Sequence, residues 1–253
     1  MAEADGHDRN GTPTAGRFLV LSATVLWSTS GLFAKAPWFL DWPESDRGML
    51  LAFWRALFAT LAMLPFLGRG TWTWRLVPMA ATFVMMNVTY LSAMVHTTAA
   101  NAIWLQYTAP LWVFLVGVGW LGEPFRRRDV VRMALCLAGV GFILVMEAGG
   151  EQASGVWLGL AAGGFYAGTI LGLRSLRDLD TGFLMAVNHA ATALVLAPVA
   201  FTRGSWPHGP QWPALALFGV VQMALPYWLF ARGVRHLVGH EASALALLEP
   251  VLV

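Results

Sequence analysis

The chain alternates long apolar runs with short polar links. A helix needs about 20 apolar residues to cross a hydrocarbon core of about 30 Å. By that measure, the pattern predicts nine membrane-spanning helices. Their approximate ranges are 18–37, 48–67, 74–95, 99–121, 130–147, 155–173, 182–202, 212–231 and 240–253. The fold class that follows is an all-α polytopic membrane protein.

The segments outside these spans are short and polar. Residues 1–17 predict a polar cytoplasmic N-terminal tail, and none of the later links is long enough to hold a soluble domain. Tryptophans stand at the ends of spans, as an interfacial aromatic belt requires. They are Trp38, Trp42, Trp72, Trp74, Trp206 and Trp212.

Composition excludes several classes of protein. Hydrophobic residues make up 57% of the chain and charged residues only 12%, against roughly 25% in soluble domains. Water-soluble enzymes and nucleic-acid-binding proteins do not fit. The single lysine, Lys35, follows Phe33 and Ala34, so no phosphate-binding P-loop exists. The single cysteine, Cys136, permits neither an intrachain disulfide nor a thiolate metal cluster. We expect no cofactor and no bound metal.

Charge predicts the orientation. With the N-terminus in the cytoplasm, twelve arginines fall in cytoplasmic segments, whereas only Lys35, Arg47 and Arg203 fall in outer ones. This bias follows the positive-inside rule. We therefore expect a multi-pass protein of the cell membrane, the inner membrane of a bacterium, with a cytoplasmic N-terminus.

A weak internal repeat relates the two parts of the chain. Residues 96–113 and 236–253 share five identities at an offset of 140 positions. The matching helices are five spans apart, an odd number, so the two copies must cross the membrane in opposite directions. Inverted repeats of this kind are typical of secondary transporters. The first repeat is expected at 18–147 and the second at 154–253.

The second repeat is shorter than the first. Few residues follow Pro250, whereas a complete fifth span follows the corresponding Pro110. We therefore expect this sequence to be a fragment of a ten-span protein, truncated within its ninth span. That the fragment is itself inactive stays an open hypothesis.

Several short motifs in order resemble the EamA family of the drug/metabolite transporter superfamily. They are Trp27, Phe53-Trp54-Arg55, Thr97–Pro110 running into Gly122-Glu123-Pro124, and Leu248-Glu249-Pro250. The resemblance covers about 18–253 and implies ten helices in two inverted five-helix bundles. It also implies transport of amino acids, other metabolites or drugs. The chain departs from the family pattern in lacking the C-terminal Gly-Glu turn and the tenth helix.

Glu249 is the sharpest candidate for a functional residue. It lies near the midplane of its predicted span, where a carboxylate is costly unless it is paired or hydrated. Pro250 follows it and predicts a helix bend, as Pro110 does in the first repeat, where Ala109 occupies the position of the glutamate. Glu249 is either a substrate or proton site, or a carboxylate that bonds a neighbouring helix or reaches a cytoplasmic vestibule.

Arg55, Asn188 and His189 are further polar residues at membrane depth. Arg55 could clamp a carboxylate, but it could equally reach the interface or hold a carbonyl. His189 could carry protons or be a hydrogen-bonded core histidine.

The remaining pathway candidates are amides and aromatic residues inside spans, which could line a cavity or simply pack. They are Trp27, Asn87, Tyr90, Trp104, Gln106, Tyr107, Tyr166, Gln222 and Tyr227. Glu123 is a candidate for an inner gate. Two sets of glycines spaced by four, Gly155, Gly159, Gly163 and Gly164, Gly168, Gly172, predict close helix packing.

These observations favour a secondary-active transporter, not an enzyme. We expect it to export small metabolites such as amino acids or amphipathic drugs, by alternating access at a midplane site between the repeats. The expected partners are a small-molecule substrate, the lipid bilayer and protons as coupling ion, with no nucleic acid. The alternatives are a passive facilitator and, from another class, a membrane-embedded lipid-modifying enzyme. The latter lacks clustered His, Asp or Glu residues in the sequence.

Overall fold

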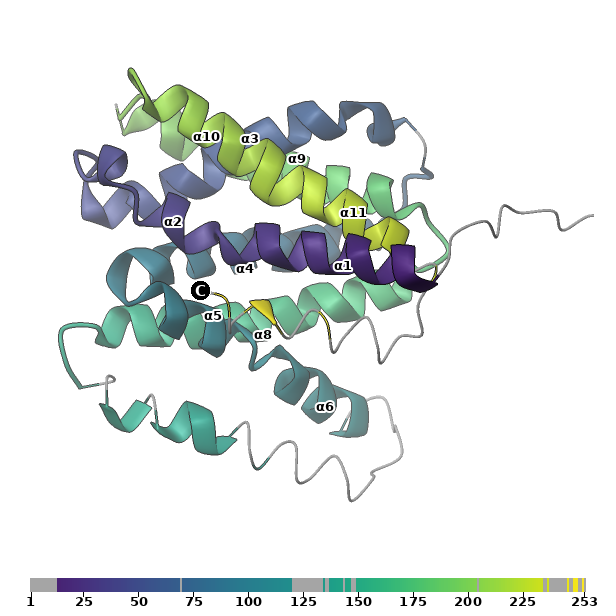
Figure 1. Ribbon diagram of the computed structural model, residues 1–253, viewed down its shortest axis with the longest axis horizontal. Coiled ribbons are helices and arrows are strands. Elements are labelled where there is room, and N and C mark those ends of the chain that lie inside the picture. Colours follow the sequence, from purple (N-terminus) through teal and green to yellow (C-terminus); the bar gives the residue numbers. More distant parts are fainter. Residues whose placement is uncertain are drawn as a thin grey trace, which may run out of the picture.

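All regular structure in the described residues is helical (Figure 1). The computed structural model describes residues 13–68, 70–119, 134, 137–142, 144–146, 149–203, 205–233, 236, 245, 248, 249 and 252. The helices of the first part are α1 (Pro13–Ser28), α2 (Ser30–Ala34), η1 (Pro37–Phe39), α3 (Glu44–Leu67), α4 (Leu76–His96), α5 (Ala99–Gln106) and α6 (Ala109–Gly119). Those of the second part are α8 (Ala153–Ser175), α9 (Thr181–Thr202), α10 (Gln211–Gly219), η2 (Val220–Ala224) and α11 (Leu225–Gly233).

Seven stretches of the described chain are long and apolar enough to cross a membrane. They are Pro13–Ala34, Glu44–Leu67, Leu76–His96, Ala99–Gly119, Ala153–Ser175, Thr181–Thr202 and Gln211–Phe230, and each coincides with a predicted span to within a few residues. Of the fifth span, the described residues include 137–142 and 144–146, which belong to a shorter apolar helix. Most of the predicted ninth span lies outside the described residues. The all-α polytopic membrane fold is confirmed.

Two spans begin earlier than the sequence predicted. Helix α1 begins at Pro13 rather than in the region of residue 18, because proline is well suited to a first helical turn that needs no N–H partner. Helix α3 begins at Glu44 rather than 48, with Glu44 and Asp46 in its first turn. Acidic side chains there interact favourably with the positive end of the helix dipole. A hydropathy pattern predicts neither of these helix starts, because it measures only how apolar the residues are.

Two spans are interrupted near their middle. The fourth divides into α5 and α6 at Tyr107 and Thr108, close to Pro110. The ring of Pro110 conflicts with the carbonyl group four residues earlier, that of Gln106, at which α5 ends. In the span from Gln211 to Phe230, the five residues Val220–Ala224 form a π-helical turn between α10 and α11. Such turns are rare and are found frequently at functional sites.

The helices pack as antiparallel pairs that are distant in sequence (Figure 1). Helix α8 lies along α4: Gly155 at its start is beside His96, and Gly172 near its end is beside Met79. Helix α3 lies along α9 in the same manner, and α1 along α11, with Gly233 against Val20. The consecutive helices α3 and α4 are antiparallel too, because Gly48 near the start of α3 is beside Ser92 near the end of α4.

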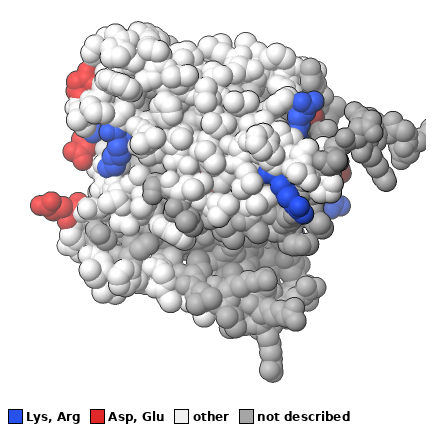
Figure 2. Space-filling model, in the orientation of Figure 1, with Lys and Arg blue, Asp and Glu red and all other residues white. Residues whose placement is uncertain are grey.

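Charged side chains lie at two ends of the molecule, and on the face seen in Figure 2 an uncharged band separates them. One end, here the Lys35 end, carries Lys35, Asp41, Glu44, Asp46, Arg47 and Arg203. The opposite end, the Arg232 end, carries the start of α1 and the end of α11. The band has the composition of a lipid-facing surface.

Candidate functional site

Five buried polar residues from four spans lie at one level, between two apolar cores. The core toward the Lys35 end includes Leu50 of α3 and Phe218 of α10, and the core toward the Arg232 end includes Met63 of α3 and Phe183 of α9. Between the two cores lie Arg55, Asn87, Asn188, His189 and Gln222, which we call the polar layer. Each of them is at most 3% exposed. Each was a candidate from sequence, and the helices bring them to a common depth.

Arg55 is a buried cation whose hydrogen-bond partner is neutral. Its side chain is 2% exposed, and its Nη2 donates to Oδ1 of Asn87 on α4. Asn87 in turn donates from Nδ2 to the carbonyl of Phe83 at 2.9 Å. The ring of Phe218 lies 4.9 Å from the Arg55 Cζ, which is a cation–π contact. No carboxylate of the described residues forms an ion pair with Arg55, so its charge is left to attract an anionic group.

Glu249 is the acidic counterpart. Its Oε2 accepts a hydrogen bond of 2.9 Å from the hydroxyl of Tyr107, at the interruption between α5 and α6. The carboxylate is partly buried. The break in the fourth span thus places a tyrosine hydroxyl where the carboxylate of a distant segment can use it.

All four tyrosines of the chain gather around these two charges. Glu249 interacts electrostatically with each of them, and Arg55 interacts with two, Tyr90 and Tyr227. The hydroxyl of Tyr90 also lies 3.1 Å from Oγ of Ser30. We call Arg55, Glu249, Tyr90, Tyr107, Tyr166 and Tyr227 the tyrosine cluster. It joins residues from both predicted repeats around a cation and an anion.

Asn188 and His189 are completely buried on α9. Neither the amide of Asn188 nor the two ring nitrogens of His189 has a hydrogen-bond partner among the described residues. The His189 ring packs edge-on against Phe83 at 5.1 Å and Tyr227 at 5.9 Å, and Arg55 acts on it electrostatically. Buried polar groups without partners are costly, about 1–3 kcal/mol each. A ligand or a change of conformation that supplied partners would therefore be favoured here.

Trp27 and Gln222 connect the first span to the π-helical turn. The Gln222 side chain donates from Nε2 to the carbonyl of Trp27 at 3.2 Å, and its Oε1 is buried without a partner in the described residues. The Trp27 ring lies 5.2 Å from Tyr227 in an edge-on contact. Trp27 therefore borders the tyrosine cluster, and Gln222 is joined to Trp27.

The other sequence candidates lie away from the cluster or outside the described residues. Trp104 is 48% exposed, and no ring pair of the described residues joins it to the cluster. Gln106 is buried at the end of α5, where its carbonyl lies close to Gly163 of α8. Glu123 and Pro250 lie outside the described residues. Two surface crevices, between α4 and α8 and between α3 and α11, do not reach the cluster.

Three features of the site were not predicted from the sequence. Ser30 bonds Tyr90, Phe218 covers Arg55, and Val220–Ala224 forms the π-helical turn. A serine and a phenylalanine in apolar spans look like ordinary packing. Pro226, just beyond the turn, is a sequence signal for the local irregularity.

We find no candidate metal-binding site in the part of the chain that the structure describes. Within it, no group of three or more His, Cys, Asp or Glu side chains is placed to hold an ion.

Comparison with known proteins gives consistent matches along the chain. The sequence profile of the EamA-like transporter family matches residues 14–145 and 153–253. An uncharacterized transporter of Archaeoglobus fulgidus is 30% identical over 241 residues, which span 92% of this chain and 82% of that protein. A crystal structure, described only as that of a protein, aligns with a TM-score of 0.66 over 94% of this chain and 85% of the other. Its identity of 21% makes it evidence for the fold alone.

Proposed function

The chain belongs to the EamA-like transporter family and is a multi-pass membrane transporter, and we propose that it exports small metabolites, amino acids or amphipathic drugs, by secondary-active transport. Its mechanism is alternating access, with the substrate held at the tyrosine cluster between two inverted repeats. The membrane is the inner membrane of a bacterium, and the N-terminus faces the cytoplasm.

The observation that carries the proposal is the pairing of charge and aromatic surface in the tyrosine cluster. Arg55 and Glu249 act on the same tyrosines, yet the described structure contains no ion pair between them. A substrate that placed an anionic group near Arg55 and apolar or cationic parts near the tyrosines would interact favourably with both parts of the cluster. Amphipathic metabolites have this character.

The helix pairs support the inverted repeats. A two-fold axis that exchanges spans one, two and three with spans six, seven and eight maps the pair α4–α8 onto the pair α1–α11. The same axis maps the pair α3–α9 onto itself. All three pairs are packed in the structure. The family profile also matches each half of the chain.

Reconstitution in liposomes tests the proposed function. Purified protein is expected to move radiolabelled amino acids or amphipathic cations across the bilayer faster than empty vesicles. An imposed proton gradient is expected to drive accumulation above the external concentration. Flux that never exceeds the substrate's own gradient would instead establish a passive facilitator, and no flux with any such solute would contradict the proposal.

The Glu249→Gln substitution tests proton coupling. The amide keeps the size of the side chain and can still accept the Tyr107 hydrogen bond, but it cannot bind and release a proton. We expect accumulation driven by a proton gradient to fall at least tenfold, while exchange at equal pH persists.

Glu44→Gln is the matched control, because Glu44 is a carboxylate at the Lys35 end and outside the cluster. Equal proton dependence in the wild-type and Glu249→Gln proteins would remove Glu249 as the coupling group.

A further inference from the structure

Helix α10 covers Arg55 from the side of the Lys35 end. Its residue Phe218 lies over the Arg55 guanidinium, and the same ring stacks on Phe33 with centroids 5.0 Å apart. Nearer the end, Trp212 packs edge-on against Trp54 at 5.1 Å. A solute coming from the Lys35 end would therefore meet α10 before it could reach Arg55.

The start of α10 is held by a buried polar contact. Gln211 is 1% exposed, and its Nε2 donates to Oδ1 of Asp41 at 2.9 Å and to the carbonyl of Trp38. Its Oε1 accepts from the backbone N–H of His208 at 3.0 Å. A carboxylate strengthens such a hydrogen bond. This contact joins the link after the first span to the beginning of the eighth, so it connects the two proposed repeats.

The other end of α10 is built to bend. A Cβ atom on Gly219 would lie 2.6 Å from the Arg55 carbonyl oxygen, so the glycine lets α10 touch the backbone of α3 at the polar layer. The π-helical turn Val220–Ala224 follows directly. Helices kink readily at such turns, where the regular hydrogen-bond ladder is interrupted.

From this arrangement we propose that α10 is a gate helix, hinged at Val220–Ala224 and latched by the Gln211–Asp41 contact. The inference rests on the proposed transport function and adds the element that closes one side of the pathway. Release of the latch tilts α10 away from α3, carries Phe218 off Arg55 and opens the cluster toward the Lys35 end.

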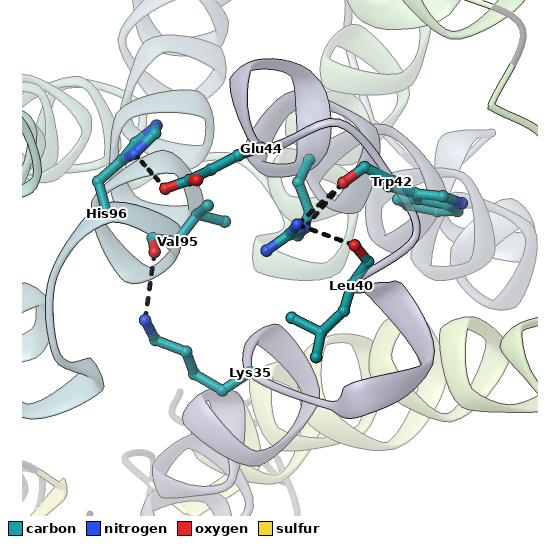
Figure 3. Close-up of polar contacts among 7 residues, drawn as sticks. Lys35, Leu40, Trp42, Glu44, Val95 and His96 are labelled. Carbon is teal, nitrogen blue, oxygen red and sulfur yellow. Dashed lines mark hydrogen bonds and ion pairs between the residues drawn. The ribbon is translucent and has the colours of Figure 1, made fainter.

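Contacts of Glu44, Lys35 and Arg47 at the same end lie within the first repeat and serve as controls (Figure 3). Glu44 Oε1 is 3.2 Å from Nδ1 of His96, and Lys35 Nζ donates to the Val95 carbonyl at 3.2 Å. Arg47 holds the carbonyls of Trp42 and Leu40. Partial burial and the charge of Arg47 lower the pKa of Lys35. None of these contacts involves α10, so their loss should leave the gate closed.

Thiol labelling tests the gate helix. The reporter is Ala214→Cys in a Cys136→Ser background, because Ala214 is 5% exposed and lies on the face of α10 that carries Gln211, one turn deeper. A water-soluble maleimide is applied to the reconstituted protein. Gln211→Ala and Asp41→Ala are each expected to label about tenfold faster than the reporter alone, since each removes a charge-assisted hydrogen bond. The double variant is expected to label more slowly than the two single effects multiplied together would give, because both variants remove the Gln211–Asp41 contact, although Asp41→Ala also removes the 3.5 Å contact of Asp41 with His208 Nε2.

Glu44→Gln is the control variant for the thiol-labelling experiment. Glu44→Gln is expected to label at the reporter's rate. The gate proposal would be wrong if Gln211→Ala and Asp41→Ala labelled at the same rate as Glu44→Gln, whether that shared rate equals or exceeds the rate of the reporter alone. Asp41 is about half exposed and so tolerates substitution, which keeps the test valid if Gln211→Ala fails to fold. If the latch variants label faster but the protein moves no substrate, the gate helix stands and the transport proposal is wrong. If the protein moves substrate but the latch variants do not label faster, the transport proposal stands and the gate helix is wrong.

Discussion

At the scale of single residues, the decisive feature is a buried guanidinium that depends on an amide. Arginine remains charged at any physiological pH, and burial of that charge in an apolar bundle is unfavourable unless polar groups face it. Asn87 provides such a group, and the face of the Phe218 ring adds a cation–π contact. Neither neutralises the charge, so an anionic group of a substrate would gain most from binding beside Arg55.

Substitution of Arg55 tests this role. Arg55→Gln is expected to reduce transport of anionic or zwitterionic solutes more than tenfold, because the attracting charge is lost. Arg55→Lys retains the charge but not the planar fork of donors, so we expect partial activity. The measurement is initial uptake into liposomes at several substrate concentrations.

Arg47→Gln is the matched control, because Arg47 stands on the same helix but holds only loop carbonyls at the Lys35 end. Unchanged affinity for anionic solutes in Arg55→Gln would show that the guanidinium is purely structural.

Polar residues of the candidate site were identifiable from the sequence where they stand out against an apolar span, and their part in transport stays a prediction. Arg55, His189 and Glu249 were identifiable for that reason, and the structure groups two of them with all four tyrosines. Ser30 and Phe218 were not identifiable, because their roles come from the neighbours that tertiary packing provides. Trp104 shows the converse case. The sequence made it a candidate for the pathway because it is an aromatic residue within a span, but its side chain is about half exposed.

At the scale of helices, the close contact of α8 with α4 and α5 depends on glycine. A Cβ atom added at Gly163 would lie 2.1 Å from Oγ1 of Thr108 and 2.7 Å from the carbonyl oxygen of Leu105. At the next residue, Gly164, the nearest heavy atom would be 4.0 Å away, on Trp112. The predicted packing role of this glycine stripe therefore applies to specific positions.

Substitution by alanine at these adjacent glycines gives a direct comparison. Gly163→Ala is expected to destabilise the protein by about 1–3 kcal/mol, because the added methyl group forces α8 away from the break between α5 and α6. Gly164→Ala is expected to be neutral or slightly stabilising, since alanine favours helix and meets no obstacle. Thermal unfolding in detergent, followed by tryptophan fluorescence, measures both. Equal melting temperatures for the two variants would contradict the tight packing at Gly163.

Helix interruptions were only partly predictable. Pro110 predicted a bend, and the fourth span is indeed divided close to it. The π-helical turn at Val220–Ala224 had no comparable signal within its own residues, because its geometry depends on the contacts of Gln222 and Gly219 with neighbouring helices.

At the scale of the whole molecule, the alternation of the spans predicts which links share a membrane face. His208 lies at the Lys35 end, where it contacts Asp41, and Arg177 lies in the link between α8 and α9 at the opposite end. In a Cys136→Ser background, an impermeant maleimide added to intact cells is expected to label His208→Cys. Arg177→Cys is expected to react only after permeabilisation.

Labelling of both cysteine variants in intact cells would contradict the alternation. Labelling of Arg177→Cys alone would reverse the proposed orientation while leaving the fold unchanged.

The order and approximate bounds of seven spans followed from apolar length, and the helix pairs did not. Seven predicted spans coincide with observed ones because the thickness of a bilayer fixes the length of a crossing helix. The pairing of α4 with α8 and of α1 with α11 depends on shape, which hydropathy does not record. The weak repeat indicated such a symmetry, and the packing of small residues determines how closely each pair approaches.

The buried guanidinium of Arg55 also bears on biogenesis. An arginine at the centre of a single helix opposes insertion by about 2.5–3.5 kcal/mol, a cost that the apolar residues of α3 must offset if the helix enters the membrane alone. The helix that carries its hydrogen-bond partner, α4, is the next to be synthesised. Entry of α3 and α4 into the lipid as one hairpin would shield the charge from the start, and the short link between them suits this order of events.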